Sequence, residues 1–192
     1  MIKYLWLSIF FSVLIWSGIN PKDSYTWLLE VAPALIGLVI MAASYQSFRL
    51  TPLLYLFILL HCMVLMVGGH YTYAEVPWFD GLLGAERNNY DKVGHFFQGF
   101  VPALIAREIL LRKQVVNGKA WLMLIIISLC LAFSAFYELI EWWVALASAE
   151  AFLGTQGYVW DTQSDMAMAL VGAISLLLLF SKLHDKQLKA IP

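Results

Sequence analysis

The sequence predicts an all-α polytopic membrane protein whose helices form a single six-helix transmembrane bundle. Of its 192 residues, 61% are hydrophobic and only 13% are charged, whereas a soluble domain carries about 25% charged residues. Six apolar segments also approach the roughly 20 residues that a helix needs to cross a bilayer. We therefore expect one integral membrane domain over residues 1–192.

The six expected spans are punctuated by residues that interrupt helices. Pro21 and Pro52 separate the first three spans, and Asn117-Gly118 separates the fourth from the fifth. The first span follows Lys3 as a signal peptide would, but it contains the bulky Trp16 and lacks a clear cleavage site, so we expect it to stay uncleaved. The spans lie near 3–19, 25–46, 51–72, 92–111, 119–147 and 163–181.

The lysines and arginines predict that both termini are cytoplasmic, because cytoplasmic loops carry an excess of these residues. With this topology, nine of the 12 lie inside and three lie outside. The inner residues are Lys3, Arg49, Arg107, Arg112, Lys113, Lys119, Lys182, Lys186 and Lys189, and the outer ones are Lys22, Arg87 and Lys92. A net charge of -1 disfavours a nucleic-acid partner. Cys62 and Cys130 are expected to be small buried hydrophobes rather than a disulfide or metal pair.

Three of the expected helices carry pairs of polar side chains at their outer ends. Asp91 and His95 are spaced i,i+4 in the fourth span, and Gln98 shares their helix face. The other pairs are Glu138 and Glu141 in the fifth span and Asp161 and Asp165 in the sixth. Ionisable residues within membranes are rare and usually face the bundle interior. The pattern therefore predicts one polar site that faces the periplasm.

Three interpretations of this site stay open. In one, a divalent metal (Zn, Mn, Fe or Mg) is bound by His95, Glu138, Glu141 and Asp165, and a spare carboxylate acts as general base. In another, Asp91 orients His95 while the acids share protons without a metal. The last is a proton- or cation-coupled pathway. Hydrogen bonds between helices are the structural alternative to all three. His61, His70 and Glu30 are expected to have structural roles only, and His184, in the basic C-terminal segment, is expected to be solvated.

Three segments together resemble the YjdF family of small bacterial inner-membrane proteins. They are YDKVGHFFQGF at 90–100, YELIEWW at 137–143 and WDTQSDMAMALVGA at 160–173. More distantly, the chain is similar to VanZ-like proteins, in which a glutamine occupies the position of Glu141. The resemblance implies a bacterial inner-membrane location and a polar site built from the motif residues. It supplies no substrate.

Two functional hypotheses follow. The first is a metal-dependent hydrolase or transferase that acts on a lipid-linked envelope substrate, with Asp91, His95, Glu138, Glu141, Asp161 and Asp165 as the catalytic candidates. The alternative is a protein that binds or carries a cation or a cationic head group without catalysis. In both, the expected partner is a membrane lipid or a lipid-linked small molecule.

Overall fold

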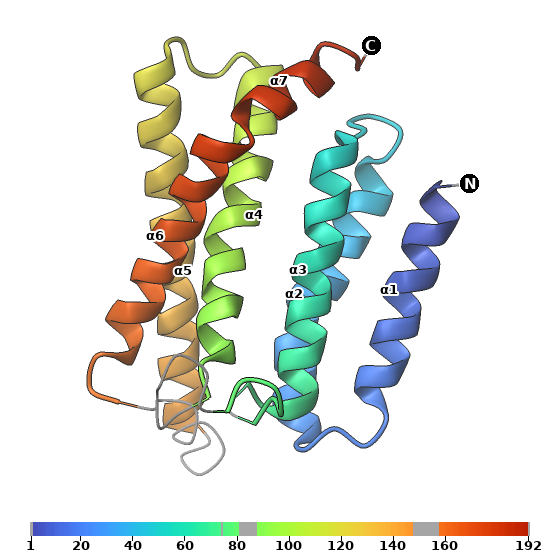
Figure 1. The fold of residues 1–192 in the computed structure, drawn as a ribbon, viewed down its shortest axis with the longest axis vertical. Coiled ribbons are helices and arrows are strands. Elements are labelled where there is room, and N and C mark those ends of the chain that lie inside the picture. Colours follow the sequence, from blue (N-terminus) through green and yellow to red (C-terminus); the bar gives the residue numbers. More distant parts are fainter. Residues whose placement is uncertain (1, 74, 81–87, 148–157, 192) are drawn as a thin grey trace. The chain divides into compact units, whose positions relative to one another are not determined.

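The computed structural model describes residues 2–73, 75–80, 88–147 and 158–191, and the regular secondary structure in these ranges is helical throughout (Figure 1). The helices are α1 (Ile2–Gly18), α2 (Ser24–Ser44), α3 (Pro52–Tyr71), α4 (Tyr90–Arg112), α5 (Lys119–Ala147), α6 (Asp161–Leu179) and α7 (Ser181–Leu188). Helices α1 to α6 correspond to the six expected spans. Helix α7 was not predicted from the sequence.

Four of the described helices are long and apolar enough to cross a membrane. They are Ser24–Ser44, Pro52–Tyr71, Lys119–Val144 and Asp161–Leu179, and Lys3–Gly18 is a shorter apolar helix. Many large apolar side chains on these helices are exposed, among them Leu28, Val39, Phe133 and Leu178. Exposed apolar surface of this extent is expected of helices that face lipid rather than water. The six-helix bundle with cytoplasmic termini stays a prediction.

The chain divides into two compact units, of which the first comprises Met1–Arg49 and Leu56–Gly94. Here Asp23 caps α2, because its carboxylate accepts a hydrogen bond from the backbone N–H of Thr26 at 2.6 Å. Trp27 Nε1 donates to Ser17 Oγ at 3.1 Å, and His70 Nδ1 donates to the Ser17 carbonyl oxygen at 2.9 Å. These bonds join the end of α1, the start of α2 and the end of α3.

The second unit comprises Leu50–Tyr55 and His95–Pro192, which includes most of α4 and all of α5, α6 and α7. Glycine allows α4 and α6 to pack backbone against backbone. A Cβ atom at Gly99 would lie 1.7 Å from the carbonyl oxygen of Ala169, and one at Gly172 would lie 2.0 Å from that of Phe96. No side chain other than hydrogen fits at either position, so both glycines are needed for this close packing.

Candidate metal site

The polar residues of the second unit meet because of the directions of α4, α5 and α6. His95 lies in the second turn of α4, and Asp165 lies in the second turn of α6. Glu138 and Glu141 lie in the last third of α5. Since α5 runs antiparallel to both neighbours (Figure 1), its end lies beside their beginnings.

The close contact at Gly99 determines which residues of α4 and α6 lie beside one another. Gly99 follows His95 by one turn on α4, and Ala169 follows Asp165 by one turn on α6. The close approach of Gly99 to Ala169 therefore brings His95 and Asp165 within reach of one another. His95, Glu138 and Asp165 are all buried, with exposed fractions of 5%, 9% and 4%.

His95 is the centre of the cluster. Its Nδ1 lies 3.9 Å from Glu138 Oε1, and its Nε2 lies 3.9 Å from Asp165 Oδ2. Ligand atoms of His95, Glu138 and Glu141 all lie within 4.8 Å of one another, a spacing that suits the first coordination shell of one metal ion. The structure thus places His95 close to each of the three acids that the sequence predicted as metal ligands.

Gln98 determines which nitrogen of the neutral His95 ring carries the proton. The amide oxygen of Gln98 lies 3.0 Å from His95 Nδ1. Because a carbonyl oxygen only accepts hydrogen bonds, Nδ1 carries a proton, and in the neutral ring Nε2 has the lone pair. That lone pair lies on the side of Asp165, so the neutral imidazole is prepared to act as a ligand through Nε2.

The charge of the cluster favours a cation. Three carboxylates, those of Glu138, Glu141 and Asp165, lie close to the one imidazole of His95. Like charges at this spacing disfavour ionisation of all three, and a divalent ion would offset most of the repulsion. Nitrogen and carboxylate donors without a thiolate suit Zn, Mn or Fe. The donor set of this site therefore fits a divalent metal.

Comparison with known proteins places the chain in a family. The model of a family described as predicted membrane protein (DUF2238) matches residues 2–186. The chain belongs to this family. It is also 50% identical over 187 residues to the inner membrane protein YjdF of Escherichia coli strain K12, a match that covers 92% of this chain and 88% of that protein. No solved structure gives a significant match.

Membership of DUF2238 confirms the resemblance to YjdF that the three sequence segments indicated. Together with the candidate spans, it identifies the chain as a multi-pass protein of the bacterial inner membrane. The more distant similarity to VanZ-like proteins stays a prediction. The family description names no activity, so the chemistry of this DUF2238 protein has to be argued from its own residues.

The remaining two site candidates precede the cluster on its helices. Asp161 lies one turn before Asp165 on α6 and is buried, with an exposed fraction of 4%. Asp91 lies in the first turn of α4, one turn before His95, and is half-buried. Asp91 belongs to the first compact unit by its packing, so its predicted role in orienting His95 stays a prediction.

The sequence interpretation missed Ser134. This residue lies one turn before Glu138 on α5, and its exposed fraction is 0%. Its hydroxyl has no hydrogen-bond partner within the described parts of the chain. The i,i+4 spacing from Glu138 was the available signal, but a serine in an apolar helix usually bonds to its own backbone and attracts little attention.

The expectations about the cysteines and the histidines have different outcomes. Cys62 and Cys130 are free and buried, as predicted, and His70 has the packing role expected of it. The expectation that His184 is solvated is wrong, because its exposed fraction is 0%. Its side chain contacts Arg107 and Glu108, so the lysine-rich C-terminal segment is not a free tail.

Proposed function

We propose that this DUF2238 protein is a metal-dependent hydrolase or transferase that acts on a lipid-linked envelope substrate at the periplasmic face of the inner membrane. The observation that carries the proposal is the position of His95. Its two ring nitrogens each lie 3.9 Å from a carboxylate, and these carboxylates come from two other helices. A packing histidine needs one partner, whereas His95 has an acidic side chain beside each ring nitrogen and Glu141 close by as well.

The residues of the site would have different roles in such a reaction. His95 Nε2 and Asp165 offer ligands on one side of the ring, and Glu138 and Glu141 offer carboxylates nearby. A divalent ion held by these residues would supply an activated water molecule. A carboxylate that is not used as a ligand would accept the proton of that water as general base. The Ser134 hydroxyl, one turn deeper, provides a hydrogen-bonding group for water or substrate.

The surroundings of α5 support a lipid-linked substrate. Trp142 and Trp143, next to Glu141, have exposed fractions of 53% and 50%, and Leu139 and Ile140 are also exposed. Aromatic side chains of this kind mark the boundary between lipid and water. A substrate with its chain in the bilayer and its head group at this boundary would therefore reach the acids from the side.

The carrier alternative has less support because the middle of the core next to the site is apolar. Leu104, Ile126 and Leu176 lie in the middle and inner parts of α4, α5 and α6, and their exposed fractions are at most 1%. A carried cation would need polar groups along this stretch. The site in the second unit is better suited to chemistry at one face.

The proposal is tested with purified protein in lipid nanodiscs and a total lipid extract of bacterial inner membranes. Mass spectrometry should show a lipid-linked species that is consumed by the protein with Zn or Mn, but not with a chelator or with Glu138→Gln. His70→Ala is the matched control, because His70 is outside the cluster. If metal-loaded protein changes no lipid species and instead carries radiolabelled metal across vesicles, the carrier function is the correct one.

A further inference from the structure

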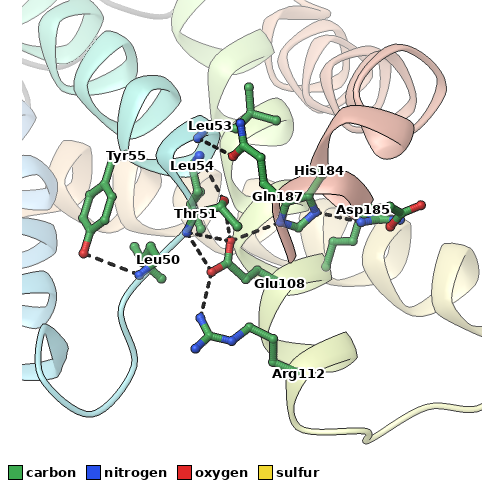
Figure 2. Close-up of polar contacts among 11 residues, drawn as sticks. Leu50, Thr51, Leu53, Leu54, Tyr55, Glu108, Arg112, His184, Asp185 and Gln187 are labelled. Atoms are coloured by element: carbon green, nitrogen blue, oxygen red, sulfur yellow. Dashed lines mark hydrogen bonds and ion pairs between the residues drawn. The ribbon is translucent and has the colours of Figure 1, made fainter. Parts of the chain in front are cut away.

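A second polar cluster of the second unit lies at the other end of α4 from His95. It joins the start of α3, the last turns of α4 and helix α7 (Figure 2). Glu108 and His184 have exposed fractions of 0%, and that of Arg107 is 6%. Charged groups are buried to this extent only when they are paired, so the contacts within this cluster define what it does.

Glu108 accepts hydrogen bonds from three directions. The backbone N–H and hydroxyl of Thr51, at the start of α3, lie 3.0 and 2.7 Å from its carboxylate oxygens. Arg112 Nη1 on α4 lies at 3.0 Å, and His184 Nε2 on α7 lies at 3.1 Å. The carboxylate is thus stabilised in its ionised form and holds three segments of the chain together.

The bond between Arg107 and His184 determines the tautomer of His184. Arg107 Nη1 lies 2.7 Å from His184 Nδ1. A guanidinium group can only donate hydrogen bonds, so Nδ1 must be unprotonated and accept. The proton of the neutral ring is therefore on Nε2, where it is donated to Glu108.

The cluster is balanced in charge only while His184 is neutral. Arg107 and Arg112 are positive, and Glu108 and Asp185 are negative, with Arg107 Nη2 lying 2.6 Å from Asp185 Oδ1. Thr51, the contact from α3, is uncharged. A proton on His184 Nδ1 would face the N–H of Arg107 and add an unbalanced positive charge inside a buried network.

We propose that this cluster is a proton-sensitive latch that holds α7 in place while His184 is neutral and releases it when His184 is protonated. Helix α7 has only eight residues and is too short to be stable alone. Its attachment depends on His184, on Asp185, and on Gln187, whose amide oxygen accepts a hydrogen bond from the Leu53 backbone at 2.9 Å. Protonation breaks the Arg107 bond because Nδ1 no longer has a lone pair.

The latch is tested in the full-length protein in nanodiscs with spin labels at Lys119→Cys and Lys189→Cys, two exposed positions of the second unit. The distance distribution should be narrow at pH 8 and broad at pH 5. The released fraction should change by at most about tenfold per pH unit, as a single coupled proton requires. His184→Gln should keep the narrow distribution at both pH values, because glutamine accepts from Arg107 and donates to Glu108 without titrating. His184→Lys should be broad at both.

Two results would overturn the latch. One is a distribution in the parent protein that stays narrow at pH 5, and the other is an equal broadening in His184→Gln. Nitrogen NMR of labelled histidine provides an independent readout that needs no substitution at His184. A His184 ring with its proton on Nδ1 at neutral pH would contradict the hydrogen-bond assignment and the latch with it.

Discussion

Replacing Gly99 by alanine tests how the packing of α4 and α6 builds the metal site. The new Cβ would lie 1.7 Å from the Ala169 carbonyl oxygen, whereas ordinary contact begins at 3.4 Å. The shortfall of about 1.7 Å falls on backbone atoms, which cannot turn aside, so the helices must separate or distort. Overpacking of this kind costs about 1–3 kcal/mol or more.

The same separation of α4 and α6 should prevent the site from holding a metal ion. His95 and Asp165 lie one turn from the new methyl group, and their ligand atoms are 3.9 Å apart. Metal coordination tolerates errors of only about 0.2 Å in ligand distance, so an opening on the order of 1 Å removes one of them from the coordination shell. We expect Gly99→Ala to lower both the unfolding midpoint in detergent and the bound metal.

Gly37→Ala is the matched control. Gly37 lies inside α2, and a Cβ atom there would meet nothing within 4 Å. Both substitutions gain the same helix propensity, about 1 kcal/mol, so the difference between them isolates the clash. Unfolding midpoints and metal contents that are the same for the two variants would refute the packing argument.

Three further predictions concern topology, ligand orientation and helix capping. A C-terminal fluorescent-protein fusion should be bright and an alkaline-phosphatase fusion inactive. The reverse pair of results would contradict the placement of the site at the periplasmic face. Gln98→Ala should weaken metal binding by roughly 10–100-fold by titration, and Gln98→Glu should restore most of it. Asp23→Ala should lower the free energy of unfolding by about 1 kcal/mol. The Thr26 backbone N–H lowers the pKa of Asp23, so this difference should persist above about pH 4 and vanish as pH falls through the lowered pKa.

The sequence predicted the long helices well because apolar length is a direct physical requirement of the bilayer. The fifth expected span, 119–147, coincides with α5, and the fourth and sixth differ from α4 and α6 by two residues or fewer at each end. Helical spacing also predicted that Glu138 and Glu141 lie close together, as they do beside His95. A separation of three or four residues puts both side chains on one face whatever the tertiary structure.

The sequence interpretation failed at α7, where the structure depends on distant partners. Two exposed lysines in the eight residues of α7, Lys182 and Lys186, with Lys189 directly after them, suggest a solvated tail. The opposite face carries His184, Gln187 and Leu188, but its burial depends on Glu108, Arg107 and Leu53. Contacts between residues more than 70 positions apart leave no local pattern in a single sequence. The same holds for Gln98, whose role depends on the orientation of the His95 ring.

Elemental analysis of the purified protein shows most directly whether His95 and the neighbouring acids bind a divalent metal. We expect a stoichiometric amount of Zn, Mn or Fe in the parent protein and in His70→Ala. The metal should be lost from His95→Ala, which should nevertheless remain a folded, monodisperse protein. A folded parent protein without bound metal, which also takes up none on dialysis against these ions, would contradict metal binding and favour proton sharing among Glu138, Glu141 and Asp165.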